Sequence, residues 1–320
     1  MIVLLTGGCK NGKSNTAQDI ACKLRTESGG GLYYVATMKS TGEEDDERIR
    51  KHVENREGLG FETIEISRDI KRIIAEKEHF LKNTFLVDSL TALLANEMFQ
   101  TNENGEFFED RSAPERVCED IRFLCKDKNS DFIFVSDGIY SDAAVYDSGT
   151  ESYRAGLALV EREVARVADE VIEMCAGKEI RHKNLHLREA DLMIKDGCGV
   201  LIVGGAGQGK LEFAKCITGA FSREDVCIYD VKDAADKVPG GYKIYRHAER
   251  LARGTDKSAE ELARLFPKEA VVICEDITCG IVPIDATDRK WRKDAGRLMQ
   301  ALSRGRKVFR VICGIGEEIG

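Results

Sequence analysis

The chain begins with MIVLLTGGCKNGKSNTAQDIA, residues 1–21, and this stretch decides the fold. An apolar run at residues 2–6 leads into a glycine-rich turn, and residues at helical spacing follow the turn. From Gly7 to Ser14 the turn matches the pattern G-x-x-x-x-G-K-[ST], in the strand–loop–helix setting that this motif requires. The sequence therefore predicts a phosphate-binding loop at the start of an α/β domain.

The residues of this loop have separate chemical roles. Glycines allow successive backbone N–H groups to surround phosphate oxygens at the positive end of the following helix. We expect Lys13 to neutralise the β- and γ-phosphates and the Ser14 hydroxyl to bind magnesium. Asp88 ends the apolar run TFLVD, where a carboxylate could reach the metal through water; a solvated strand end is the alternative. We therefore predict nucleotide binding with Mg²⁺, with the metal at Ser14 and Asp88.

Apolar runs of strand length alternate with amphipathic stretches over the first half of the chain. The expected strands are residues 2–6, 32–36, 63–66, 84–88, 132–136 and 170–175. This alternation is typical of an α/β fold with a mostly parallel sheet flanked by helices, here P-loop NTPase-like. We predict a P-loop domain over residues 1–178, a connector over 179–197, and a shorter homologous domain over 198–320.

Strand, glycine loop and helix recur in GVLIVGGAGQGKLEFAKCITGA, residues 199–220. Such self-similarity indicates a tandem duplication with a shorter second α/β unit. The second loop keeps its glycines and Lys210 but has Leu211 where the first loop has Ser14. A leucine side chain cannot bind magnesium, so we expect a structural relic or a weak anion site rather than a second catalytic centre.

Composition excludes several classes of protein. Lys and Arg total 48 against 56 Asp and Glu, and the formal charge of −8 argues against a general nucleic-acid binder. No apolar run is long enough for a membrane span, and the N-terminus goes straight into a strand without a targeting segment. The 11 cysteines have no C-x-x-C pair, so we expect reduced thiols in a cytoplasmic protein.

A histidine lies in RIRKHVENR, residues 48–56. On a helix, Arg48, His52 and Arg56 are spaced i, i+4 and i+8 and share one face. One interpretation is an exposed histidine on a charged helix. The other is a neutral imidazole nucleophile, with two guanidinium groups to hold the attacked phosphate.

Taken together, these stretches resemble one family. TGGCKNGKS, YYVATM, ERIRKHVENR, FETIE and FLVDSLTALLANEMF, all between residues 6 and 99, occur in the order and spacing of the bacterial adenosylcobinamide kinase / adenosylcobinamide-phosphate guanylyltransferase of cobalamin biosynthesis. The resemblance implies two reactions. A nucleoside triphosphate phosphorylates adenosylcobinamide, and a histidine then takes GMP from GTP and transfers it to adenosylcobinamide phosphate. It implies His52 as the guanylylated residue, with Lys13 and Asp88 as further catalytic residues.

The resemblance also implies which residues bind nucleotide. They are Gly7, Gly8, Cys9, Lys10, Asn11, Gly12, Lys13, Ser14, Ala36, Thr37, Met38, Val53, Glu54, Asn55, Arg56, Glu65 and Asp88. The expected substrates are adenosylcobinamide, GTP and ATP, with Mg²⁺ as the metal. We expect no nucleic-acid partner, and a homo-oligomer or a pseudo-oligomer formed through the tandem halves.

The chain departs from the family pattern after the fifth strand. There the family shows V-S-N-E-V-G-x-G-I-V-P and then F-R-D-x-x-G-R-x-N-Q, but residues 135–149 read VSDGIYSDAAVYDSG. The second half instead carries G-I-V-P at 280–283, followed by Arg289, Arg292 and Arg297. We therefore expect a loop of the second half to complete the active site of the first. A decaying duplicate that is kept for stability is the alternative.

Two other functions remain open from the sequence. The altered second part of the first half allows an adenosylcobinamide kinase that has lost the transferase activity. A non-catalytic GTP-binding regulatory or assembly protein is the other alternative. Lys13, Ser14, Asp88 and His52 argue against it, because binding alone needs neither the hydroxyl nor the imidazole.

Overall fold

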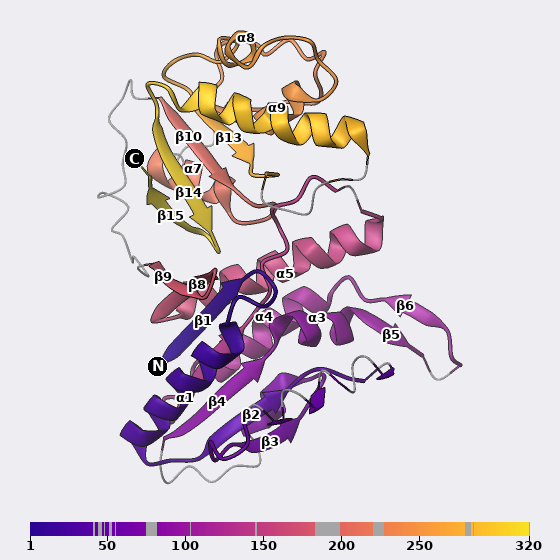
Figure 1. Ribbon diagram of the computed structural model, residues 1–320, viewed down its shortest axis with the longest axis vertical. Coiled ribbons are helices and arrows are strands. Elements are labelled where there is room, and N and C mark those ends of the chain that lie inside the picture. Colours follow the sequence, from indigo (N-terminus) through magenta and orange to yellow (C-terminus); the bar gives the residue numbers. More distant parts are fainter. Residues whose placement is uncertain are drawn as a thin grey trace. The chain divides into compact units, whose positions relative to one another are not determined.

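The computed structural model of the chain describes all residues except 41, 44–46, 48, 51, 52, 55, 75–81, 103, 145, 183–198, 220–226, 279–282, 284 and 320. The chain forms two compact units (Figure 1). Unit 1 comprises Met1–Gly138 and Asp147–Asn184, and unit 2 comprises Ile139–Tyr146 and Leu185–Gly320. Unit 2 therefore includes a short segment that comes from the middle of the first half of the sequence.

Unit 1 is built on a seven-stranded sheet with the order β3-β2-β4-β7-β1-β8-β9. Its strands are β1 (Ile2–Gly7), β2 (Leu32–Ala36), β3 (Glu62–Glu65), β4 (Asn83–Asp88), β7 (Ser130–Val135), β8 (Glu170–Cys175) and β9 (Lys178–His182). All neighbours are parallel except β8 and β9. The six strands predicted from the apolar runs are confirmed, each within two residues.

Strand β9 occupies residues that were expected to begin the connector. Ala176 and Gly177 both have positive φ, which turns the chain back along β8. The resulting pairing is antiparallel and joins Cys175 to Lys178 and Val171 to His182. The strand is mostly polar and exposed because it lies at the edge of the sheet, so it lacks the apolar run by which the buried strands were found.

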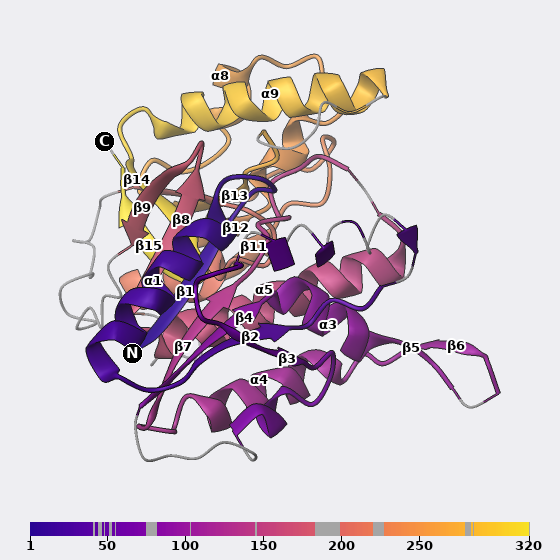
Figure 2. The same ribbon diagram turned by 60° about the horizontal axis from the view of Figure 1, so that its bottom comes forward.

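Helices cover both faces of this sheet. They are α1 (Lys13–Ser28), the 3₁₀ helix η1 (Ile70–Ile74), α3 (Leu90–Met98), α4 (Ala113–Leu124) and α5 (Ser148–Val167). Helix α1 buries Ala17 and Ala21 against Val3 and Leu5 of β1, while α3, α4 and α5 gather on the other face (Figure 2). A hairpin of β5 (Phe99–Thr101) and β6 (Phe107–Glu109) extends from the end of α3.

The central strands carry a stack of aromatic rings. Phe132 of β7 is fully buried, and its ring centroid lies 5.4 Å from that of Phe85 and 5.9 Å from that of Phe134. Such rings bury large apolar areas and add a preference for stacked geometry. Because β7 is also the strand between β1 and β4, its packing fixes the spacing of the strands that carry the site described below.

Replacing Phe132 by alanine tests this central position. We expect Phe132→Ala to lower the free energy of unfolding by about 3–5 kcal/mol, since it removes a buried ring and leaves a cavity. Phe123→Ala, at a side chain that is 54% exposed, should change it by less than about 0.5 kcal/mol. Urea denaturation followed by circular dichroism measures both, and equal losses would contradict the inference.

Unit 2 has a six-stranded sheet with the order β11-β12-β13-β10-β14-β15. Its strands are β10 (Val200–Gly204), β11 (Ile228–Asp230), β12 (Ile244–Arg246), β13 (Val271–Glu275), β14 (Lys307–Ile312) and β15 (Ile315–Glu318), and its helices are α7 (Lys210–Ile217), η3 (Ala248–Ala252), α8 (Ala259–Ala263) and α9 (Ala286–Ser303). Helix α7 packs Phe213 and Ile217 on one face. On the other face, α9 packs Trp291, Ala295 and Leu298.

The two sheets share an arrangement around their glycine loops. In unit 1 the order is β7-β1-β8-β9 and in unit 2 it is β13-β10-β14-β15, and in both the last pair alone is antiparallel. Beyond β13, the described residues of unit 2 form the two three-residue strands β12 and β11. This correspondence supports the proposed duplication with a shorter second copy. Among the described residues, no helix combines the length and apolar character needed to cross a bilayer.

Candidate nucleotide-binding site

The first glycine loop joins β1 to α1 at the carboxyl edge of the unit 1 sheet. Gly7 has a φ of 140°, and a Cβ atom there would lie 2.4 Å from the Met174 carbonyl oxygen of β8. Only glycine fits such a close approach of two backbones. In the rest of the loop, Cys9, Lys10 and Gly12 are exposed. The loop therefore has its predicted strand–loop–helix setting and is accessible from solvent.

The Lys13 side chain donates hydrogen bonds to the backbone of its own loop. Its Nζ donates to the carbonyl oxygens of Gly7 and Gly8, at 2.9 and 2.7 Å. It also forms an ion pair of 2.8 Å with Asp137, which follows β7, and Lys13 is only 7% exposed. Asp137 was not predicted from the sequence, although an acid directly after a buried strand was a usable signal. The ammonium is thus held at the loop with a carboxylate beside it.

Ser14 and Asp88 lie together as predicted. The Ser14 hydroxyl donates to Asp88 Oδ2 at 3.1 Å, across 74 residues of sequence. The Tyr34 hydroxyl donates to the same oxygen at 2.9 Å. A hydroxyl and a carboxylate are hard oxygen ligands of the kind that Mg²⁺ prefers, so these two residues fit the expected metal. Tyr34 was not predicted, because its position in the apolar strand YYVA suggested only a core residue.

Arg56 joins this group through Tyr34. Its guanidinium lies 4.1 Å from the centroid of the Tyr34 ring, a cation–π distance. Its Nη2 donates to Thr63 Oγ1 at 3.2 Å, and Arg56 is only 9% exposed. A predicted nucleotide-binding residue is therefore packed against the residue that bonds Asp88.

The other predicted residues of this edge have different degrees of exposure. Ala36, at the end of β2, pairs with both Asp88 and Glu65, and the Glu65 side chain is exposed. Thr37 is buried, and its Oγ1 donates to the Ser89 carbonyl oxygen at 2.8 Å and accepts from the Ser89 N–H at 2.7 Å. The Thr37 hydroxyl is thus used in hydrogen bonds to the Ser89 backbone, while Met38 is partly exposed.

The stretch predicted to carry the nucleophile is described only in part. Val53 and Glu54 are helical and exposed. His52 and Asn55 lie outside the described residues, as does Arg48. The role of His52 therefore stays a prediction, as does the role of the G-I-V-P residues 280–282, which also lie outside them.

The comparison with protein families decides the assignment. The family model of cobinamide kinase / cobinamide phosphate guanyltransferase matches residues 3–182, more than half of the chain. The chain belongs to this family. The match runs from β1 to the end of β9, and it supports a transferase of cobalamin biosynthesis that binds nucleotides. No curated protein matches the chain.

Three solved structures have a partial likeness to this family member. The flagellar accessory protein FlaH from Methanocaldococcus jannaschii is 15% identical, with 57% of this chain and 75% of that chain covered and a TM-score of 0.27. A KaiC-like protein from Pyrococcus horikoshii OT3 is 19% identical, with coverages of 57% and 76% and a TM-score of 0.32. A solved ATPase domain is 9% identical, with coverages of 54% and 68% and a TM-score of 0.30. At these scores the likeness carries no functional information.

In the second glycine loop of this cobinamide kinase-family chain, other residues of unit 2 contact the loop backbone and side chains. The N–H of Ala206 donates to the Tyr140 carbonyl oxygen at 2.9 Å, and a Cβ atom at Gly205 would lie 2.6 Å from Tyr140 Cβ. Gln208 Oε1 accepts from the Cys313 N–H at 2.6 Å. Gly205 and Gln208 are buried, whereas their counterparts in the first loop, Gly8 and Asn11, are partly exposed. These contacts support the structural-relic interpretation, since the loop binds protein where a phosphate would need its N–H groups.

Both positions of the magnesium pair have changed in unit 2. Leu211 packs against the apolar cluster under α7. Tyr245 of β12 pairs with Val272 in unit 2, and Val87 of β4 pairs with Phe134 in unit 1, so Tyr245 and Val87 occupy equivalent positions. The next residue along the strand is Arg246 in unit 2 and Asp88 in unit 1. An aliphatic side chain and a guanidinium therefore replace the hydroxyl and the carboxylate, and neither binds a cation.

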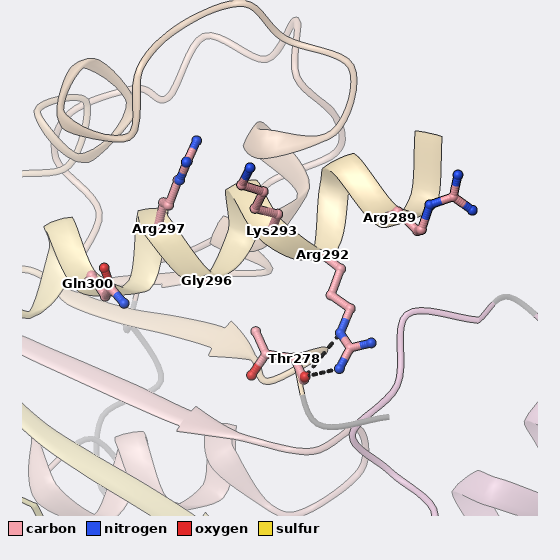
Figure 3. A pocket seen from close by; sticks show the side chains of 7 residues that line it. All are labelled: Thr278, Arg289, Arg292, Lys293, Gly296, Arg297 and Gln300. Carbon is pink, nitrogen blue, oxygen red and sulfur yellow. Dashed lines mark hydrogen bonds between the residues drawn. The ribbon is translucent and has the colours of Figure 1, made fainter. Parts of the chain in front are cut away.

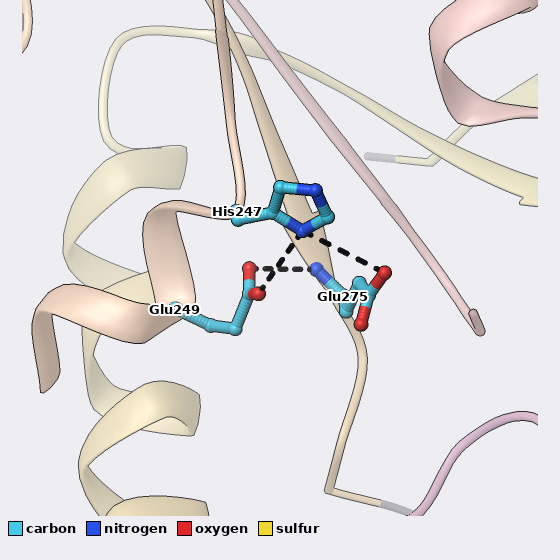
Figure 4. Close-up of side chains that lie close together, drawn as sticks. All are labelled: His247, Glu249 and Glu275. Atoms are coloured by element: carbon cyan, nitrogen blue, oxygen red, sulfur yellow. Dashed lines mark hydrogen bonds and ion pairs between the residues drawn. The ribbon is translucent and has the colours of Figure 1, made fainter. Parts of the chain in front are cut away.

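Lys210 remains in the second loop and is balanced by acids. Its Nζ donates to the Gly205 carbonyl oxygen at 2.5 Å. Burial lowers the pKa of Lys210, and the carboxylates of Glu275 and Glu249 oppose that shift. His247 Nδ1 lies 3.7 Å from an oxygen of each carboxylate (Figure 4). The two glutamates thus compensate a buried ammonium.

His247, Glu249 and Glu275 could also hold a metal ion, since their donor atoms lie within 4.8 Å of one another. However, Arg246 Nη2 lies 3.3 Å from His247 Nε2. A guanidinium there favours the lone pair on Nε2 and hence the proton on Nδ1, which faces the carboxylates. In that tautomer Nδ1 carries a proton and is not a metal ligand, and at 3.7 Å it faces the carboxylates without a hydrogen bond.

We expect Asp137→Asn to strengthen GTP binding by about fivefold, or about 1 kcal/mol, because the carboxylate competes with phosphate for Lys13. Isothermal titration calorimetry measures this change. Asp19→Asn, on the exposed side of α1, removes the same charge and should leave the affinity unchanged. Weaker binding in Asp137→Asn would show that the carboxylate helps to hold the nucleotide.

Leu211→Ser restores the G-x-x-x-x-G-K-[ST] pattern in the second loop. We expect it to leave the number and affinity of GTP sites per chain unchanged, because Tyr140 occupies the loop and Arg246 stands at the position of the metal-binding acid. Equilibrium dialysis with GTP and Mg²⁺ measures both quantities. An added GTP site in this variant would contradict the relic interpretation.

Proposed function

We propose that the chain carries out two reactions on one corrinoid. It phosphorylates the hydroxyl of the aminopropanol group of adenosylcobinamide with ATP or GTP, and it then transfers GMP from GTP to adenosylcobinamide phosphate. The observation that carries the proposal is the contact of 3.1 Å between Ser14 and Asp88, beside Lys13, within the residues that the family model matches. A hydroxyl and a carboxylate that would hold Mg²⁺ beside the phosphates are the groups that phosphoryl transfer uses.

In the first reaction the chain positions a phosphoryl group for attack. The loop N–H groups and Lys13 hold the phosphates, while Ser14 and Asp88 would hold Mg²⁺, which neutralises charge on the transferred group. The substrate hydroxyl oxygen forms a bond to the γ-phosphorus as the bond to the β-γ bridging oxygen breaks. The nucleoside diphosphate leaves with that oxygen, and the hydroxyl proton passes to solvent.

In the second reaction His52 acts as the nucleophile. Its ring nitrogen forms a bond to the α-phosphorus of GTP, and pyrophosphate leaves with the bridging oxygen. A phosphate oxygen of the corrinoid then attacks the phosphoramidate and frees the imidazole. A covalent intermediate of this kind divides one difficult encounter into two.

The structure supports this role of His52 through its neighbour in sequence. Four residues later, Arg56 is anchored on Tyr34, and Tyr34 is bonded to Asp88. The helical residues Val53 and Glu54 lie between His52 and this anchor. Arg56, a predicted nucleotide-binding residue, is therefore held beside the residues that would bind the metal.

Labelling with GTP that carries radioactive phosphorus at the α position tests the proposal. We expect acid-labile, base-stable label on the protein in the presence of Mg²⁺, and no label on His52→Ala. His247→Asn serves as the matched histidine control, because asparagine tolerates the positive φ of 58° at that position, and it should keep the label. Asp88→Asn should slow labelling by about 10- to 100-fold through loss of metal affinity.

The same samples distinguish the alternatives. Phosphorylation of adenosylcobinamide without protein label would leave a kinase that has lost the transferase activity. GTP binding with neither reaction would leave a regulatory or assembly protein. Label that persists in His52→Ala would assign the nucleophile to another residue.

A further inference from the structure

A groove on α9 of unit 2 is lined by cations (Figure 3). It has a volume of about 580 Å³, within the range of small-molecule sites. Its lining includes Arg289, Arg292, Lys293 and Arg297, together with Gly296 and Gln300 of the same helix, and no acid among the described residues. These residues lie outside the part of the chain that the family model matches.

The groove follows from the two-sided pattern of α9. Trp291, Ala295 and Leu298 are buried in the core of unit 2. The cations follow i, i+3 and i+4 spacings on the other side of the helix, where Lys293 and Arg297 point the same way while Arg292 turns toward Thr278 (Figure 3). Like charges at these spacings destabilise an isolated helix. These charges therefore cost helix stability unless an anion neutralises them.

The acidic residues of α9 pair with cations outside the groove or only partly offset a groove cation. Asp288 pairs with Arg253 at 3.0 Å. Asp294 lies 3.8 Å from Lys290 and 3.8 Å from Arg297, so it offsets Arg297 only in part. Lys293 has no ion pair with any described residue. The groove thus keeps a positive field.

One guanidinium in the groove is held in a fixed orientation. Arg292 Nε donates to the Thr278 carbonyl oxygen at 3.0 Å, and Nη2 donates to the same oxygen. Thr278 is held in turn by Asp276, which accepts from its N–H at 3.0 Å and from its hydroxyl at 2.6 Å. The Nη1 group of Arg292 has no partner among the described residues. A guanidinium that is fixed in this way can donate hydrogen bonds to an oxyanion without first being ordered.

A glycine of α9 also lines the groove. Glycine within a helix is less stable than alanine. At Gly296 a Cβ atom would meet only Thr278 Cγ2 at 3.4 Å, an ordinary contact, and φ is not positive. The fold therefore does not require glycine at this position. Its effect is to keep the floor of the groove open between the cations.

We propose that this groove binds a small molecule through a multiply charged phosphoryl group. The cations of the groove match two or more negative charges, and its volume of about 580 Å³ fits a small molecule rather than a nucleic-acid backbone. A polyphosphate and a phosphorylated corrinoid share this chemistry. The proposal does not depend on guanylyl transfer, and it holds whether or not His52 is labelled.

Binding of inorganic pyrophosphate to the full-length chain tests the proposal. The measurement uses Lys13→Ala as the background, to remove the contribution of the first glycine loop, at about 0.15 M ionic strength. We expect one saturable site per chain by isothermal titration calorimetry. Lys293→Ala and Arg297→Ala should each weaken it by about tenfold or more, as expected for a hydrogen bond to a charged group.

Two further variants separate a built site from a general charge effect. Lys290→Ala removes one positive charge from the same helix, but Lys290 does not line the groove and donates to the Thr255 carbonyl oxygen at 3.0 Å. It should leave the affinity within about twofold. Gly296→Ala keeps every cation and should weaken binding by blocking the floor, without lowering the thermal unfolding midpoint.

The outcomes are distinct. Absence of saturable binding would overturn the proposal, as would equal losses in Lys290→Ala and Lys293→Ala. Competition by GTP and by adenosylcobinamide phosphate then identifies the source of the phosphoryl group. Stronger competition by the corrinoid supports a substrate site, stronger competition by GTP supports a nucleotide site, and equal competition supports a site that recognises phosphate alone.

Discussion

The position of β7 between β1 and β4 is the constraint on which the site depends. The three strands are parallel, so their carboxyl ends lie along one edge, and Ser14 reaches Asp88 across the end of the intervening strand. The same arrangement places Asp137, at the end of β7, beside Lys13. Tyr34 reaches Asp88 from the next strand, β2. The charges of the site are therefore set by strand order, and the stacked aromatic side chains of β7 maintain that order.

Unit 2 has a strand–loop–helix element without the hydroxyl and carboxylate found in unit 1. It keeps the strand order, the glycines and a buried lysine, but Leu211 and Arg246 replace the hydroxyl and the carboxylate of the metal pair. The N–H of Ala206, which would otherwise point to phosphate, binds the chain itself. The positive charge available to a ligand lies instead on α9. Two units with a similar strand order thus have their cationic groups at different places.

The sequence predicted the parts of the structure that depend on local pattern. Buried parallel strands were found because both of their faces are apolar, and Ser14 and Asp88 were found because a motif and a strand end mark them. The edge strand β9 was missed because it is polar and exposed. The bond between Ala206 and Tyr140 was missed because nothing in either local sequence marks so distant a contact. Tyr34 matters through three-dimensional proximity, which a single sequence does not reveal, whereas the position of Asp137 after a buried strand was a signal that could have been used.

The membership of residues 139–146 in unit 2 has a consequence for biosynthesis. On the ribosome this segment is made before β10, whose Leu201 belongs to the buried cluster that contains Ala143. The N-terminal half therefore cannot reach its final structure as an independent folding unit while it emerges, unlike most tandem domains. The nascent chain must leave Tyr140 and Ala143 uncovered until the C-terminal half has been translated. If the two halves were made as separate chains, Tyr140 and Ala143 would stay uncovered until the chains associated.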